Sequence, residues 1–304
     1  MRGTDVPDNR DDRHENRAGA IDARLRELIG QPAVSEAYVR FRLDLLAAQR
    51  AARRALADPA AATRRPGDER AASLPVRPGD VPFPVAVLED LLRAIRVASA
   101  TYGKETGELQ RLNAAAMANR TLLPSLVAAA AFGPELEALE ALARQADVYP
   151  DALLFVGRAL AAPCVAEAVR ARGGYAAADV HETAPNRCPA CASVPSIARL
   201  RREDGHRLLT CGLCGSEWEA KRLACACCGT EDYARLGVLR LADTDARWVE
   251  TCDGCKGYIK TVDERRLPEG EPVLAVVEET ATLHLDLLAE REGYIRRVPY
   301  VLTD

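Results

Sequence analysis

Four Cys-x-x-Cys pairs lie within 68 residues of this 304-residue chain, and they constrain its fold more than any other feature. Each pair forms a turn that directs two sulfurs toward one point, so two such turns can enclose a tetrahedral metal ion. Eight thiols at this spacing predict two four-cysteine sites for Zn²⁺ or Fe. The predicted ligands are Cys188, Cys191, Cys211, Cys214, Cys225, Cys228, Cys252 and Cys255.

The intervals between the pairs, 19, 10 and 23 residues, indicate which turns share a metal. Residues 193–211 read as a β-hairpin with a turn at Glu203-Asp204-Gly205, and residues 229–251 read similarly. The 10-residue interval is short for a hairpin and suits a linker. We therefore expect the first turn to pair with the second and the third with the fourth, in two tandem zinc-ribbon-like domains at 188–222 and 223–265.

Other uses of the thiols were weighed against metal binding. Residues 5–17 are highly charged and lack the apolar segment of a secretory signal, so disulfides are not favoured and a cytoplasmic location is expected. A thioredoxin-type dithiol needs a strand–helix context and is not expected in four copies. Sites filled by four cysteines are usually structural, and redox sensing or metal storage is the alternative.

The part of the chain before the cysteines has a helical pattern. Residues 1–20 are charged and predict a disordered tail. Residues 21–175 carry apolar residues at helical spacing without strand alternation, which predicts an all-α bundle. Its last helix, 151–172, is expected to be interrupted at Pro163. No run of 18 apolar residues occurs, so no membrane span is predicted.

A further helix is predicted at residues 271–291, packing on the metal region or on the bundle. The carboxylates around His284 are Glu278, Glu279, Asp286, Glu290 and Glu292. A carboxylate cluster on a helix is usually a solvated face, and a partner-binding face is the alternative.

Three further residues were considered as part of the sites. Cys227 lies inside the third pair but does not fit the Cys-x-x-Cys spacing, so it is predicted to be a free thiol. Cys164 is predicted to be a small buried apolar residue. His181 precedes the first turn, but eight cysteines already fill two sites. The sequence contains no nucleophile–base pair, P-loop or dinucleotide fingerprint, so no catalytic site and no enzymatic activity are predicted.

Nucleic-acid binding is the competing function for a zinc-ribbon protein, and the charge argues against it. Residues 188–265 contain twelve Lys and Arg and twelve Asp and Glu. A divalent ion held by four thiolates carries a net charge of −2, so two occupied sites make the region acidic. Nucleic-acid ribbons normally show a positive charge or a basic stripe.

Further stretches accompany the eight cysteines, namely Glu217-Trp218, Glu250-Thr251-Cys252-Asp253-Gly254-Cys255-Lys256-Gly257-Tyr258-Ile259-Lys260, Leu285-Asp286-Leu287-Leu288 and Gly293-Tyr294-Ile295-Arg296. With these stretches the chain resembles the formate dehydrogenase accessory protein family, usually called FdhE. The resemblance is strongest from 188 to 296 and weaker over the helical part. Two departures are Ala192, where the family usually has Gly, and Glu278-Glu279, near its usual paired aspartates.

The resemblance implies an α-helical domain followed by two rubredoxin-like metal domains, with iron in the cysteine sites, although spacing alone leaves zinc possible. It also implies a cytoplasmic, non-enzymatic factor that binds the catalytic subunit of a respiratory formate dehydrogenase before export. Oxidation of iron would change a site's charge by one, so the client could sense it. We take Glu217, Trp218 and Tyr294 as candidate partner-binding residues, with packing against its own turn as the alternative for Trp218. A nucleic-acid-binding accessory protein and a rubredoxin-type electron carrier remain the alternative functions, and self-association stays open.

Overall fold

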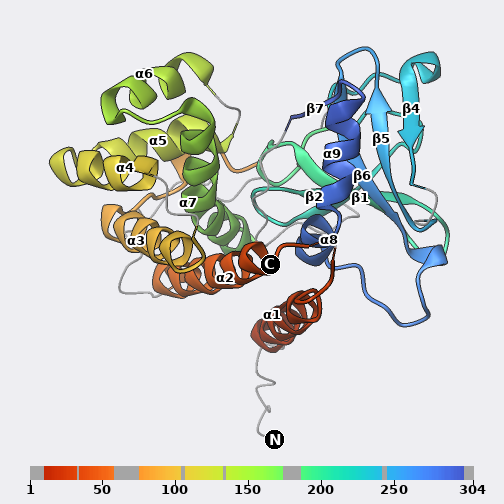
Figure 1. The fold of residues 1–304 in the computed structure, drawn as a ribbon, viewed down its shortest axis with the longest axis horizontal. Helices are drawn as coiled ribbons and strands as arrows, with labels where there is room; N and C mark the ends of the chain where they lie inside the picture. The colour runs from red at the N-terminus through yellow and green to blue at the C-terminus, as the bar shows by residue number, and fades with distance from the viewer. Residues whose placement is uncertain are drawn as a thin grey trace, which may run out of the picture.

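The computed structural model describes residues 10–32, 34–57, 75–103, 107–132, 135–173, 186–241 and 245–297, with side chains from residue 16 onward. A group of helices forms one side of the molecule and a twisted sheet with two further helices forms the other (Figure 1). The N-terminal helices are α1 (Arg10–Glu27), α2 (Glu36–Ala57), α3 (Val85–Thr101), α4 (Gly107–Ala118), α5 (Leu122–Ala131), α6 (Leu136–Ala146) and α7 (Pro150–Ala171). This arrangement confirms the predicted fold class of a helical part followed by small β metal regions.

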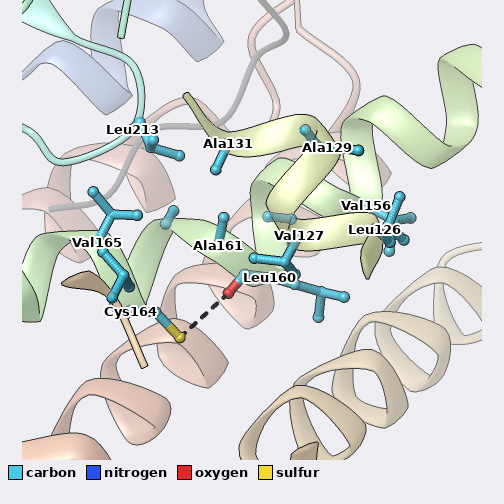
Figure 2. Close-up of a cluster of buried hydrophobic side chains, with 14 of the residues drawn as sticks. Leu126, Val127, Ala129, Ala131, Val156, Leu160, Ala161, Cys164, Val165 and Leu213 are labelled. Atoms are coloured by element: carbon cyan, nitrogen blue, oxygen red, sulfur yellow. Dashed lines mark hydrogen bonds between the residues drawn. The ribbon is translucent and has the colours of Figure 1, made fainter. Parts of the chain in front are cut away.

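Helix α7 is the centre of the bundle and packs on α2, α5 and α6. It approaches α5 closely at Gly157, where a Cβ atom would lie 2.7 Å from that of Ala130. Figure 2 shows the resulting core, with Leu126 and Val127 of α5 against Leu160 of α7. Cys164 lies in the same core, as expected, and its thiol donates to the carbonyl of Leu160 at 3.9 Å.

The predicted interruption at Pro163 is wrong, because α7 runs through it from Pro150 to Ala171. Proline has no N–H for the carbonyl of Ala159, four residues earlier. In this fold Gln49 of α2 replaces the missing donor, since its Nε2 donates to the Ala159 oxygen at 3.0 Å. Gln49 is fully buried. A side chain 110 positions away in sequence therefore provides the hydrogen bond that the Ala159 carbonyl lacks because of Pro163.

Helix α1 begins at Arg10, so residues 10–20 are helical rather than the disordered tail that their charge predicts. The C-terminal half of α1 carries buried apolar side chains, and the helix continues from there toward the N-terminus. Ile21 and Leu25 are 1% and 0% exposed and pack in a core shared with Val276 of the C-terminal region.

Helix α7 has the length and hydropathy of a membrane span, the one such helix among the described residues. However, 78% of its apolar window is buried inside the protein, as in the core helix of a globular domain. The helix therefore gives weak support for a membrane span.

The C-terminal part is built on one seven-stranded sheet rather than two separate ones. The strands are β1 (Pro195–Leu200), β2 (Arg207–Cys211), β3 (Glu217–Ala220), β4 (Leu236–Leu239), β5 (Arg247–Cys252), β6 (Gly257–Asp263) and β7 (Ile295–Arg296). Their order is β3-β2-β1-β6-β5-β4, and β7 pairs with β6. Two antiparallel ribbons, β1–β3 and β4–β6, thus join through the parallel pairing of β1 with β6.

The helix predicted at 271–291 is divided into α8 (Ala275–Ala281) and α9 (Leu283–Arg291). Thr282 breaks the helical path with a ψ of 29°, and its hydroxyl donates to the Glu278 carbonyl at 2.6 Å. Helix α9 packs on the sheet, where Leu285 and Ala289 cover Val249. Helix α8 packs beside α1 instead.

The carboxylates of Glu278, Glu279 and Asp286 form buried ion pairs, so these three make up neither the solvated face nor the partner-binding face expected for them. Glu290 and Glu292 are exposed. Glu279 and Asp286 are both 2% exposed. Lys260 of β6 lies 2.8 Å from Asp286, and Arg296 of β7 lies 2.6 Å from Glu279 and 2.7 Å from Asp286. Glu278 pairs with Arg247 of β5. Arg296 thereby ties β7 to α8 and α9, while β7 joins the sheet by pairing with β6.

Candidate metal centres

The first group of sulfurs comes from two turns on either side of the β1–β2 hairpin. Cys188 and Cys191 precede β1, while Cys211 ends β2 and Cys214 follows it. Cys188 Sγ lies 3.6 Å from Cys214 Sγ, and Cys191 Sγ lies 3.5 Å from Cys211 Sγ. All four sulfurs lie within 4.8 Å of one another.

The second group repeats this arrangement in the other ribbon. Cys225 and Cys228 precede β4, while Cys252 ends β5 and Cys255 lies between β5 and β6. The sulfurs of Cys225 and Cys255 are 3.8 Å apart, and those of Cys228 and Cys252 are 3.9 Å apart. The structure thus brings the turns together in the pairs that the spacing predicts, the first with the second and the third with the fourth.

These distances fit a tetrahedral metal ion. Metal–sulfur bonds of about 2.3 Å around a tetrahedral centre place neighbouring sulfurs about 3.8 Å apart. A disulfide would need about 2.05 Å. All eight cysteines are free thiols in this structure. The donor set and its geometry therefore suit Zn²⁺ or Fe in each group, and we propose these eight residues as the metal ligands.

The backbone of the turns supplies hydrogen bonds to the sulfurs. The amides of Leu213 and Cys214 point at Cys211 Sγ, and those of Cys227 and Cys228 point at Cys225 Sγ, at 3.3–3.5 Å. Such bonds stabilise a thiolate, which is the form that binds metal.

One sulfur in each group is favoured as a thiolate before any metal binds. The hydrogen bond from Cys227 lowers the pKa of Cys225 to about 4, although burial opposes this. Burial also raises the pKa of Cys211, but the hydrogen bonds from the other three cysteines of its group hold that pKa well below its usual value.

All four turns place the residue after the second cysteine in the left-handed region. Gly215 and Gly229 have φ of +75° and +78°, and Ala192 and Lys256 have +56° and +54°. Glycine adopts this conformation freely, whereas a side chain with a Cβ is strained there. Ala192 is thus a strained residue in the first turn.

The two groups differ in their surroundings. Cys188, Cys191 and Cys211 are at most 1% exposed and belong to the hydrophobic core that also contains α5 and α7. Figure 2 shows Leu213 of the second turn approaching the helices of this core. In the second group Cys228 is exposed. The first site is therefore an internal part of the molecule, and the second is open to solvent.

Arg158 of α7 also reaches the first site, and the sequence analysis missed it. Its guanidinium donates to Ser193 Oγ in the first turn at 3.2 Å and to the Ala131 carbonyl at 3.2 Å. Burial lowers the pKa of Arg158, while the sulfurs of Cys211 and Cys191 raise it. A buried cation thus lies beside a site whose four thiolates give it a negative charge. An arginine within an otherwise apolar helix is the sequence signal that could have identified it.

The candidate partner-binding residues lie in different settings. Trp218 is 1% exposed and belongs to the hydrophobic core, in line with the packing alternative. Glu217 pairs with Arg199 at 3.0 Å across the sheet. Tyr294 lies beside the fourth turn, where its hydroxyl donates to Asp253 at 3.1 Å. Cys227 is partly buried in the third turn, and its thiol faces the Tyr258 carbonyl at 3.7 Å. His181 falls outside the described residues.

Comparison with known proteins identifies the region that holds both groups. The FdhE central-domain model matches residues 187–222, and the FdhE C-terminal-domain model matches residues 223–302. Together the two ranges contain all eight cysteines. Over these residues the chain is similar to the central and C-terminal domains of FdhE.

FdhE proteins of several bacteria are also similar to the chain. It is 34% identical over 175 residues to the protein FdhE homolog of Pseudomonas aeruginosa, a match that covers 54% of either chain. It is 37% identical over 112 residues to protein FdhE of Escherichia coli O127:H6, covering 36% of this chain and 35% of that protein. The alignments thus span about half, or about a third, of these relatives.

The crystal structure of the FdhE protein from Pseudomonas aeruginosa has the same fold. The superposition has a TM-score of 0.60 and covers 94% of both chains at 24% identity. It includes nearly all of the helical part, which the two domain matches do not reach.

Proposed function

We propose that the chain is a metal-dependent accessory protein for the assembly of formate dehydrogenase. The observation that carries the proposal is the match of the central and C-terminal FdhE domains to the region in which the eight cysteines form two tetrahedral groups. In this proposal the chain binds the catalytic subunit of the enzyme in the cytoplasm before that subunit is exported, and it performs no catalysis itself.

The residues give the metals a defined part in this function. Each group would hold one ion through four thiolates, and the ion would crosslink two turns in a ribbon with little core of its own. Iron in these sites supplies a one-electron couple, while zinc supplies the crosslink alone. The chain contributes the buried environment of the first site and the open face of the second.

A pull-down of the tagged chain from the cytoplasm of its own host tests the proposal. We expect the formate dehydrogenase catalytic subunit among the recovered proteins, identified by mass spectrometry. Its recovery should be lost when Cys188 and Cys191 are both replaced by Ser. The matched control is Cys164→Ser, because that thiol is buried in α7 and belongs to neither group of four cysteines.

Two results would contradict the proposal. Recovery of nucleic acid without any formate dehydrogenase subunit would favour a nucleic-acid-binding protein. Recovery of an unrelated reductase instead would favour an electron carrier.

A further inference from the structure

A groove of about 280 Å³ lies between the second metal group and the outer strands of the sheet. One wall is the segment from Arg222 to Cys227, which includes the ligand Cys225. The opposite wall is formed by β4 and by Trp248 of β5. A metal bound by Cys225 would hold the first wall in place, so the shape of the groove depends on the second site.

Large apolar side chains are exposed around this groove. Leu223, Tyr233 and Val238 are 68%, 78% and 52% exposed, and all three line it. Apolar side chains that gather around a concave surface and remain in water mark an interaction site. They leave apolar area here that a partner could bury.

Strand β4 supplies backbone groups beside these side chains. It is the last strand of the sheet and pairs with β5 alone among the described residues. An edge strand presents free N–H and C=O groups, to which an extended segment can add as a further strand. Val238 is paired with Glu250 in the register, and both residues line the groove. Because side chains alternate along a strand, an added strand would direct every second side chain toward the groove.

The charge of the lining selects among extended segments. Arg207 is paired with Glu250. The guanidinium of Arg222 donates to the Gly205 carbonyl, and that of Arg240 donates to the Asp245 carbonyl and stacks on Trp248 at 4.0 Å. Among the described residues these two arginines bond to carbonyl groups rather than to carboxylates, so they leave two cationic groups in the lining that complement carboxylates.

We propose that this groove binds an extended, acidic segment of a partner protein, which adds to the edge of β4 and places apolar side chains at alternate positions into the groove. The identity of the partner, the formate dehydrogenase catalytic subunit, rests on the proposed function. The groove would then explain why client binding needs metal, since a ligand cysteine forms part of its wall.

The test measures binding of the purified catalytic subunit to the full-length, metal-loaded chain. The groove variant is Leu223→Ser with Val238→Ser. The matched control is Met117→Ser with Leu136→Ser, which removes two exposed apolar side chains from α4 and α6 of the bundle. We expect the groove variant to bind about tenfold or more weakly and the control to stay within about twofold of the unmodified chain.

A charge pair at one position tests the acidic character of the segment. Val238→Glu should weaken binding more than Val238→Lys, because a carboxylate there repels the segment. A photo-crosslinking residue at position 233 should join the chain to one extended stretch of the catalytic subunit, identified by mass spectrometry.

The possible failures are distinguishable. If the unmodified chain does not bind the subunit, the proposed function fails and the inference falls with it. If the unmodified chain binds and the groove variant binds equally well, the docking surface is wrong while the function stands. A stronger effect of Val238→Lys would overturn the acidic segment, and crosslinks to a second copy of the chain would show a dimer contact instead.

Discussion

At the scale of single residues, the metal turns depend on the conformation of one position after each second cysteine. Ala192 and Gly229 occupy this position in the first and third turns, both with positive φ. The Ala192 amide also closes its turn by donating to the Cys188 carbonyl at 2.7 Å. Since the fold imposes the conformation, the side chain at this position decides how much strain the turn carries.

Replacing Ala192 with Gly should therefore stabilise the protein. Relief of the left-handed strain outweighs the greater freedom of glycine in the unfolded chain, by about 0.5–1 kcal/mol. Gly229→Ala is the matched opposite change, because its new Cβ would lie an acceptable 3.4 Å from Asn186. It should cost about 1 kcal/mol. Thermal unfolding of metal-loaded protein measures both, and equal signs for the two changes would contradict the account.

Glu279 gives a pH dependence at the same scale. Burial raises the pKa of Glu279, but the charges of Arg296 and Lys260 lower it by more. The pKa in the folded state therefore lies below the usual value. Its contribution to stability is therefore complete above the unfolded pKa of about 4.3 and is lost as the pH falls through the lower folded value.

We expect Glu279→Gln to lower the free energy of unfolding by about 3 kcal/mol at pH 7, because it leaves Arg296 and Lys260 partly uncompensated in a buried site. The difference between the two proteins should shrink as the pH falls below about 4.3. Denaturant titrations of both proteins at several pH values measure this, and comparison at each pH cancels the effect of acid on the metal sites. A difference that grows at low pH would contradict the assigned pKa direction.

At the scale of elements, side chains from distant parts of the chain complete local structure. Gln49 supplies the donor that Pro163 removes from α7. Gln49→Leu should therefore cost about 1–3 kcal/mol, since it leaves a buried carbonyl without a donor. In a chain that also carries Pro163→Ala the loss should be smaller, because the restored N–H can reach Ala159. Chemical denaturation of the four proteins of this cycle measures the coupling, and equal losses in both backgrounds would exclude the compensation.

The difference between local patterns and contacts across distant parts of the chain explains what could be predicted from the sequence. The cysteine groups and the helical part follow from local spacing and period, and the sequence analysis predicted both. The continuous α7 could not be predicted, since it depends on Gln49 in another helix. The single sheet depends on the parallel pairing of β1 with β6, more than 60 positions apart.

Burial of charge was the other limit. The carboxylates of Glu279 and Asp286 look exposed in sequence, because their partners Lys260 and Arg296 lie on two other elements. The sequence left two settings open for Trp218 for a similar reason, since only the packing of the whole core shows that it is covered.

At the scale of the whole molecule, the two metal groups have different roles in one structure. The first group shares a core with α5 and α7 and lies beside Arg158, so losing its metal would disturb the contact between bundle and sheet. The second group is exposed at Cys228 and borders the groove along β4. The first site thus holds the halves together, and the second supports the proposed docking surface.

This difference predicts two phases of metal release to a chelator. The second site should lose its ion first, because Cys228 is open to solvent. Release from the first site requires opening of the shared core and should be about tenfold slower or more. A colorimetric chelator follows the time course, and Cys228→Ser should remove the fast phase alone. If Cys228→Ser removed the slow phase instead, the assignment of the fast phase to the second site would be wrong.

The metal content of the purified chain tests the central claim, two independent four-thiolate sites, most directly. Elemental analysis should find two ions of Fe or Zn in each chain, and one ion in Cys191→Ser or in Cys228→Ser. Cys227→Ser should keep both. A chain without metal, or one whose metal content is unchanged by both ligand substitutions, would contradict the account.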